Sequence, residues 1–435
     1  MRSILVLSFI VASRFFGLFI VLPVLSLYAL KLENANDFLV GLLVGVYALM
    51  QVIFQVPFGM LSDKIGRKKT MLLGLVLFII GSLICSLAND IYTMLLGRIL
   101  QGSGAIGAVA SAMISDFVSE EQRGKAMAMM GGFIGIAFAL SMVLAPIMSA
   151  KFGLSSLFDL SAALSLLCII LLYTAVPKEP KITHENSKTP LLALLKEKNL
   201  ALMNATNFMQ KMLMSIAFLL IPIILVERFH YEKLWLVYTA SMLVGFVAMG
   251  FAGALGEKRG LAKHILLAGV VFFIFSYILF AFFDHLAIFI AAVVIFFLGF
   301  NLHEPIMQSC ASKFCKVNEK GKALGAFNAF GYAGSFSGGV IGGIFLHFDA
   351  LKILALIMII LAFFWLFSLF FLKNPFDLKN LYLPLLDTKL DINAVLKLKG
   401  VLEVYKNHHH LVVKFDKAQI SQKELEELMG KIIAH

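Results

Sequence analysis

Residues 59–68 read Gly-Met-Leu-Ser-Asp-Lys-Ile-Gly-Arg-Lys and close an apolar run that begins at Phe38. The same pattern of glycine, acid and base returns 194 residues later as Gly-Ala-Leu-Gly-Glu-Lys-Arg-Gly at 253–260. A second motif, Gly-Lys-Ala, occurs at 124–126 and again at 321–323, an offset of 197. Two motifs that recur in register predict a duplicated unit. We therefore expect two similar halves.

The composition places these halves in a membrane. Of the 435 residues, 60% are hydrophobic and 14% are charged, and the mean hydropathy is +0.92. Soluble domains are about 45–50% apolar and about 25% charged. An ordinary soluble protein is therefore excluded, and the 41 Phe against only 10 Pro also exclude a disordered or collagen-like chain.

Twelve apolar runs are long enough to cross a bilayer, since a hydrocarbon core of about 30 Å takes roughly 20 helical residues. Backbone groups in lipid must be paired within the segment, so each run is expected to be an α-helix. The fold class is an all-α membrane protein of twelve transmembrane helices in two six-helix repeats. The predicted spans are 3–30, 38–61, 70–88, 92–115, 126–150, 157–176, 201–226, 234–255, 264–283, 286–312, 323–348 and 351–372.

The basic residues predict the orientation. Loops on the side of the N-terminus carry eighteen Lys or Arg, against five on the opposite side. Positive loops stay in the cytoplasm, so both termini are expected there. The net charge of +11 is mostly this topology signal, and no nucleic-acid partner is expected.

Four segments follow from the changes in composition. They are an N-terminal bundle at 1–176, a cytoplasmic linker at 177–200, a C-terminal bundle at 201–372 and a soluble module at 380–435. The 63 residues after Leu372 contain ten Lys and eight Asp or Glu, as a soluble domain would.

The soluble module has a β-α-β-β-α pattern, which suits a small α+β ferredoxin-like domain with an unknown ligand or partner. A capping box at Ser421 to Glu424 opens its last helix. Its predicted elements are a strand at 381–386, a helix at 392–398, a hairpin of 401–405 with 411–415, and a helix bearing Leu425, Leu428, Met429 and Ile432 on one face.

No metal or cofactor is expected. His408, His409 and His410 are either a metal site or a solvated hairpin tip, and successive histidines that alternate in direction favour the tip. The four cysteines lie in apolar runs without CxxC spacing and are expected to be small buried hydrophobes: Cys85, Cys168, Cys310 and Cys315.

The loop at 59–68 resembles the GxLaDrxGrk signature of the major facilitator superfamily. The matching positions are Gly59, Leu61, Asp63, Gly66, Arg67 and Lys68. Residues 98–104, Arg-Ile-Leu-Gln-Gly-Ser-Gly, are similar to the second signature, RxxQGxG. The glycine-proline signature of drug:proton antiporters is partly met by Gly132, Gly135 and Pro146, while Ala145, Ser149 and Ala150 depart from it. The resemblance implies a twelve-helix transporter of small molecules.

Gly59, Asp63, Gly66, Arg67 and Asp116 are the candidate conformational switch. A carboxylate at the membrane surface can accept hydrogen bonds from a helix N-terminus. The resemblance implies that Asp63 meets the N-terminus of the eleventh helix in the outward-facing state, and that Arg67 pairs with Asp116. The alternative is a positive-inside loop with an incidental aspartate.

Polar residues inside apolar spans are costly and are functional candidates by default. Each could equally make a purely structural contact between helices. The candidate proton and substrate cavity comprises Arg14, Gln51, Gln55, Arg98, Gln101, Asn207, Lys211, Asn301, His303 and Glu304.

Glu304 is the sharpest candidate, because it is the only carboxylate well inside a predicted span. Desolvation would make such a carboxyl able to take up and release protons. The alternative is that Glu304 is a permanent ion-pair partner of Arg14, Arg98 or Lys211. Three cations against one acid favour neutral or anionic amphiphiles as substrates.

The sequence therefore predicts a secondary active transporter that works by alternating access and exports small amphiphilic compounds or drugs in exchange for protons. It is expected to be a monomer in the lipid bilayer of a bacterial inner membrane. The alternatives are a dedicated sugar or organic-acid transporter, and a membrane sensor that acts through its C-terminal domain. An enzyme is not expected, because the chain has no P-loop, HExxH or GxSxG motif.

Overall fold

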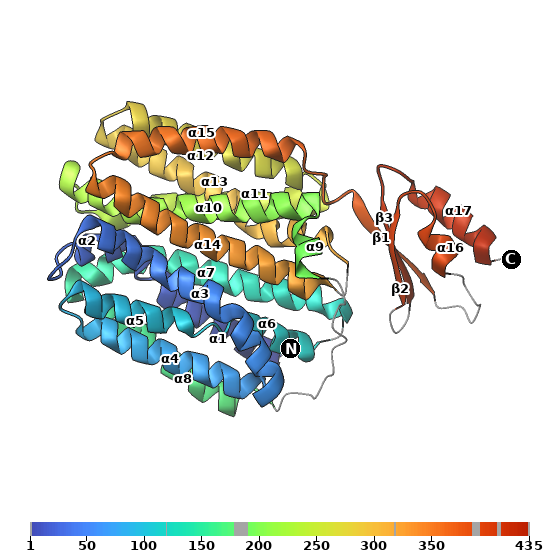
Figure 1. Ribbon diagram of the computed structural model, residues 1–435, viewed down its shortest axis with the longest axis horizontal. Coiled ribbons are helices and arrows are strands. Elements are labelled where there is room, and N and C mark those ends of the chain that lie inside the picture. The colour runs from blue at the N-terminus through green and yellow to red at the C-terminus, as the bar shows by residue number, and fades with distance from the viewer. Residues whose placement is uncertain are drawn as a thin grey trace.

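The computed structural model describes residues 2–118, 120–177, 190–316, 319–384, 392–406 and 410–433. A bundle of long helices forms most of the molecule, and a small domain of three strands and two helices lies at one end of it (Figure 1). We call this end of the bundle the tail end and the opposite one the far end. Both the N-terminus and the short helix α9 lie toward the tail end (Figure 1).

The helices follow the predicted spans closely. Those of the first half are α1 (Arg2–Phe19), α2 (Leu22–Ala29), α3 (Asp37–Ile65), α4 (Arg67–Leu87), α5 (Ile91–Ser103), α6 (Gly107–Asp116), α7 (Glu120–Phe152) and α8 (Ser155–Thr174). Those of the second half are α9 (Leu191–Leu195), α10 (Lys198–Ile223), the π-helix η1 (Ile224–Arg228), α11 (Leu234–Gly253), the π-helix η2 (Ala254–Lys258), α12 (Ala262–Phe282), α13 (Leu286–Lys313), α14 (Lys320–His347) and α15 (Leu351–Phe370).

Eleven helical segments of the described chain are long and apolar enough to span a membrane. The remaining predicted span, 92–115, is broken, so the expectation of one continuous helix there is wrong. The chain leaves the helix at Gly104 and resumes it at Gly107, which gives the two shorter helices α5 and α6. At the break the chain passes close to α4, since a Cβ on Gly104 would lie 2.3 Å from the carbonyl oxygen of Gly74.

The two halves meet closely at the far end. Helices α3 and α14 cross there backbone to backbone, because a Cβ on Gly41 would lie 2.4 Å from the carbonyl oxygen of Gly339. One turn along, a Cβ on Gly45 would lie 2.8 Å from the carbonyl oxygen of Phe336. Ser26 on α2 adds a hydrogen bond of 2.8 Å to the carbonyl oxygen of Leu219 on α10. The far end is therefore closed.

The buried apolar clusters differ between the two ends of the bundle. One buried apolar cluster contains residues of both halves, and its first-half members, such as Val24 and Leu43, lie toward the far end. Toward the tail end the first half has a separate cluster of its own, which includes Leu7, Met71 and Met113. Among the described residues, the apolar core that both halves share thus includes the far end, whereas the tail-end cluster of the first half has no member from the second.

The C-terminal domain matches the predicted β-α-β-β-α order. Its elements are β1 (Leu378–Pro384), α16 (Ile392–Leu396), β2 (Val401–Lys406), β3 (His410–Asp416) and α17 (Gln422–Ile433). The strands form an antiparallel sheet in the order β1-β3-β2. The predicted cap is present, with the amide of Glu424 3.2 Å from the hydroxyl of Ser421.

The domain has its own apolar core. Leu425 and Met429 of α17 pack in it with Val413 of β3. His408 and His409 lie outside the described residues, while His410 begins β3.

We expect Gly41→Ala to destabilise the closed far end, because its methyl group has no space against Gly339. Overpacking of this kind costs about 1–3 kcal/mol, measurable as a lower thermal unfolding midpoint of the purified protein in detergent. The control is Gly131→Ala on α7, where a Cβ would meet no atom within 4 Å. Equal effects of the two substitutions would contradict the closed seam.

Candidate functional site

Two of the predicted polar residues donate hydrogen bonds to backbone carbonyl oxygens at the break in the fourth span. Arg14 on α1 donates from Nη2 to the carbonyl oxygen of Gly104 at 2.8 Å. Gln51 on α3 donates from Nε2 to the carbonyl oxygen of Gly102. Carbonyls freed in a membrane-spanning helix need such partners. Both side chains therefore have a structural contact, which was the alternative left open for them.

A second cation lies close to Arg14. Both guanidinium groups lie near the ring of Tyr47 on α3, whose centroid is 5.4 Å from Cζ of Arg14 and 4.9 Å from Cζ of Arg98. Cation–π contacts of this kind are favourable when desolvated. Sequence analysis missed Tyr47, although it lies one turn before Gln51 on the same helix.

Arg98 is completely buried on α5. Its Nη1 donates to Oε1 of Gln101 at 2.9 Å, and Nε2 of Gln101 donates to the hydroxyl of Ser82 at 2.8 Å. Within the described residues, Nε and Nη2 of Arg98 have no hydrogen-bond partner. The described part of this half therefore holds two interior cations with no carboxylate in ion-pair contact.

Gln55 is buried one turn beyond Gln51. It lies beside the start of α6, since a Cβ on Gly107 would be 3.8 Å from its Nε2. Its Oε1 has no partner among the described residues. Gln51 and Gln55 thus line the break between α5 and α6 from α3.

In the second half, Glu304 on α13 forms an ion pair with Lys211 on α10. Nε2 of Gln210 lies 3.4 Å from the same carboxylate oxygen, and Nζ of Lys211 lies 4.9 Å from the centroid of the Phe300 ring. The side chains of Lys211 and Glu304 remain 24% and 31% exposed. Of the three cations considered as partners of Glu304, the structure selects Lys211.

The side chains of the other predicted residues of this half bond to backbone carbonyls. Asn207 donates to the carbonyl oxygen of Phe327 on α14 at 2.7 Å, and Asn301 donates to the carbonyl oxygen of Phe297 one turn earlier at 2.8 Å. His303 is fully buried on another face of α13, where Nε2 lies 2.8 Å from the carbonyl oxygen of Leu266 on α12. His303 therefore lies apart from the Lys211–Glu304 pair.

Aromatic side chains close the interior toward the far end. The ring of Phe138 on α7 lies 5.0 Å from that of Phe19, 6.3 Å from Phe218 and 5.7 Å from Phe300. Phe19 and Phe138 belong to the first half, and the other two belong to the second. Sequence analysis missed this cluster, because nothing distinguishes its members among 41 Phe.

The switch residues gather where α3 turns into α4. Gly66 has φ +99°, which favours glycine, and ends α3. Arg67 forms ion pairs with Asp63 at 2.6 Å and with Asp116 of α6 at 3.2 Å. The Asp116 side chain is 5% exposed, whereas that of Asp63 is 65% exposed. In this arrangement Asp63 therefore bonds within its own half and is largely exposed. A Cβ on Gly59, one turn earlier, would meet no atom within 4 Å.

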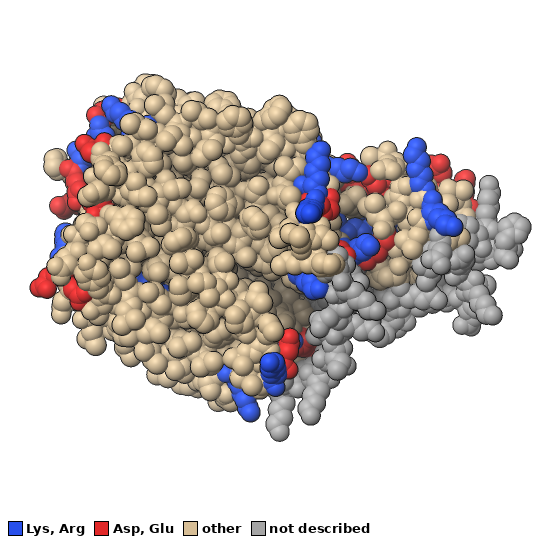
Figure 2. Space-filling view, viewed as in Figure 1, with Lys and Arg blue, Asp and Glu red and all other residues tan. Residues whose placement is uncertain are grey.

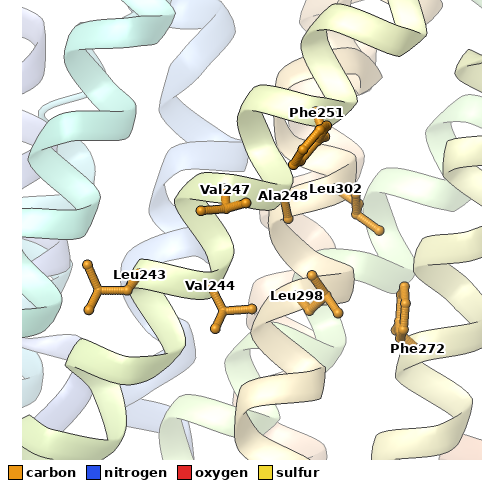
Figure 3. A pocket seen from close by; sticks show the side chains of 8 residues that line it. All are labelled: Leu243, Val244, Val247, Ala248, Phe251, Phe272, Leu298 and Leu302. Atoms are coloured by element: carbon orange, nitrogen blue, oxygen red, sulfur yellow. The ribbon is translucent and has the colours of Figure 1, made fainter.

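A separate groove of about 520 Å³ lies between α11, α12 and α13, and every side chain that lines it is apolar (Figure 3). Val247, Phe251 and Leu243 are largely exposed in it. A groove without polar groups cannot orient a polar substrate and has the character of a surface that faces hydrocarbon. None of the predicted cavity residues lines it.

The fold and these contacts define a multi-pass membrane protein whose two helical halves enclose a polar interior. A sequence profile of the Major Facilitator Superfamily matches residues 7–339 and 236–382. The chain belongs to the major facilitator superfamily and is a transporter of that fold.

Similar proteins include the inner membrane transport protein YajR of Escherichia coli (strain K12), which is 33% identical over 428 residues, or 95% of this chain and 94% of that protein. The tetracycline resistance protein, class B, of Escherichia coli is 28% identical over 343 residues, or 71% of this chain and 80% of that protein. Among solved structures, the nucleoside transporter NupG aligns with a TM-score of 0.67 at 14% identity, over 85% of this chain and 98% of that one. This last likeness concerns the fold alone.

A double-mutant cycle measures how far Lys211 and Glu304 stabilise each other. We expect Lys211→Gln and Glu304→Gln each to lower the free energy of unfolding, and the double variant to lose less than their sum. The expected coupling is about 0.5–3 kcal/mol, as for contacting residues, measured by denaturation in detergent.

The exposed pair Arg228–Asp284 is the matched control, with side chains 46% and 55% exposed. Its cycle with Arg228→Gln and Asp284→Asn should give about 0–1 kcal/mol. If the coupling energy of Lys211–Glu304 is no larger than that of this control pair, the interior pair does not stabilise the fold.

Proposed function

We propose that this transporter exports small amphiphilic compounds from the cytoplasm in exchange for protons, by alternating access of one interior cavity. The tail end is the cytoplasmic side, in agreement with the excess of basic loops there. The arrangement described above is then the inward-facing state, with the far end closed by α3 and α14.

The moving parts are the two bundles at 1–176 and 201–372, joined by the linker at 177–200, with 380–435 as an accessory domain. Since one chain contains both bundles, a monomer suffices for transport. The membrane is the bacterial inner membrane, with both termini in the cytoplasm, and the chain has no catalytic role.

The charges of the interior support the substrate class. Arg14, Arg98 and Lys211 outnumber Glu304 in the described spans. A lipophilic cation would add to this positive excess in a medium of low dielectric, where like charges repel strongly. Neutral or anionic amphiphiles fit better, with their apolar parts against Phe138 and Phe300.

The observation that carries the proton coupling is the Lys211–Glu304 pair. Glu304 forms the ion pair only while its carboxylate is charged. Proton uptake neutralises the carboxylate and therefore releases Lys211. The interior then holds three cations without a carboxylate, which is a different electrostatic state from the paired one. Both side chains are partly exposed in the open state, so water can deliver the proton.

We expect Glu304→Gln to abolish proton-coupled transport while the protein still folds, because glutamine cannot release a proton at neutral pH. The measurement uses purified protein in liposomes with an imposed pH gradient and a chemically diverse substrate panel. The control is Asp159→Asn, at an exposed position near the start of α8, which should retain coupling. Full coupling in a well-folded Glu304→Gln protein would remove Glu304 from the mechanism.

We expect Asp63→Asn to slow the transport cycle while substrate affinity from the tail side changes little, because Asp63 is exposed in the present state. Turnover in liposomes and equilibrium binding in detergent measure the two quantities. Asp116→Asn is the comparison, since its buried carboxylate pairs with Arg67 and its loss should also lower stability. A large loss of affinity in Asp63→Asn would contradict its role in the conformational change.

A further inference from the structure

A cavity of about 690 Å³ lies at the tail end, between the membrane bundle and the C-terminal domain. Basic side chains dominate its wall, and blue side chains gather where the two parts meet (Figure 2). Among the described residues that line it, Asp377 is the single acid. The six basic residues of this pocket are Arg259, Lys313, Lys320, Lys379, Lys414 and Lys417.

Both parts of the protein supply these charges. Arg259 follows η2, while Lys313 ends α13 and Lys320 begins α14, so two connections between membrane helices contribute three cations. The C-terminal domain contributes the rest, from β1, from β3 and from the residue that follows β3: Lys379, Lys414 and Lys417. The pocket exists only where the two parts lie together.

Direct contacts hold the two parts in this position. Nζ of Lys414 donates to the carbonyl oxygen of Cys315 at 2.7 Å, and Nδ2 of Asn374 donates to the carbonyl oxygen of Gly260 at 2.9 Å. Nζ of Lys313 lies 3.8 Å from the centroid of the Phe376 ring. The walls of the pocket are therefore fixed by specific interactions.

The positive charge has little compensation. In the part of the chain that the structure describes, no acidic side chain lies within ion-pair distance of Arg259, Lys320, Lys379 or Lys417. Asp416, the nearest acid on β3, pairs with Lys373 instead.

Burial lowers the pKa of Lys414, and the nearby Lys320 and Lys313 lower it further, while Cys315 and Glu403 act in the opposite sense. Cations held together in this way repel each other, and a bound anion would relieve that repulsion.

We propose that this pocket binds a phosphate-bearing anion that bridges the membrane bundle and the C-terminal domain. Arginine offers a planar fork that matches phosphate oxygens, and lysines bind phosphate as point charges. The ends of membrane helices lie at the depth of lipid headgroups, where basic pockets bind anionic lipids. The phosphate comes from a lipid headgroup or from a soluble phosphorylated molecule.

The test uses the full-length protein in nanodiscs of phosphatidylcholine alone, or of phosphatidylcholine with phosphatidylglycerol. Inorganic pyrophosphate is titrated into the first preparation. Thermal unfolding measures stabilisation in both, and native mass spectrometry measures retained phosphatidylglycerol. The pocket variant is Lys379→Gln with Lys417→Gln, and the control is Lys397→Gln with Lys423→Gln, which removes the same charge from exposed positions of the same domain outside the pocket.

We expect a higher unfolding midpoint with one of the two probes. We also expect about thirtyfold weaker binding of that probe in the pocket variant, since each of the two lysines removed contributes about 1 kcal/mol near an anionic surface. Stabilisation by pyrophosphate in phosphatidylcholine alone assigns a soluble phosphate. Stabilisation and retention that require phosphatidylglycerol assign a lipid headgroup. Failure of both probes to stabilise the protein, or equal losses in the pocket and control variants, would overturn the proposal.

Discussion

Hydrocarbon offers no hydrogen bonds and solvates no charge, and this constraint governs the interior of the protein. Each polar group within a span must therefore find its partner in the protein. Arg14 and Gln51 do so at the carbonyls of Gly104 and Gly102. Lys211 and Glu304 do so by pairing with each other. Arg98 does so only in part, through Gln101 and the ring of Tyr47.

The same constraint separates residues that support the helices from residues that remain available. Asn207, Asn301 and His303 satisfy backbone carbonyls and sit in closed packing. Arg98 retains donors without a described partner, and the Lys211–Glu304 pair remains partly exposed. In the described spans, polar groups that lack a hydrogen-bond partner or remain partly exposed thus lie in both halves.

Sequence alone predicted most of the fold, because its signals are local. The length and hydropathy of a run define a span. The alternation of apolar and polar residues, together with a capping box, defines the elements of the C-terminal domain. The order of its strands came only from the structure. The break at Gly104 was not predicted, since hydropathy does not reveal that the chain there passes close to Gly74 on another helix. Tyr47 and Phe138 were missed for a similar reason, because only packing distinguishes them from other aromatic residues.

The sequence predicted which polar residues lie in the interior, but not which hydrogen-bond or ion-pair partners they have. That Glu304 meets Lys211 rather than Arg14 or Arg98 depends on which helices lie side by side, and periodicity does not contain that information. The basic pocket was equally absent from the prediction, since its cations come from two connections between membrane helices and from β1, β3 and the residue after β3 of a separate domain.

The interruption between α5 and α6 also bears on how the first half can deform. Its backbone has already left the helical hydrogen-bond ladder, so bending at this point breaks no further ladder bonds. Helix α5 is anchored to α4 through close backbone contact at Gly97, whereas α6 carries Asp116 and with it the tie to Arg67. Because Arg67 begins α4 and Gly97 meets the last turns of the same helix, α4 braces the interrupted span on both sides of the break.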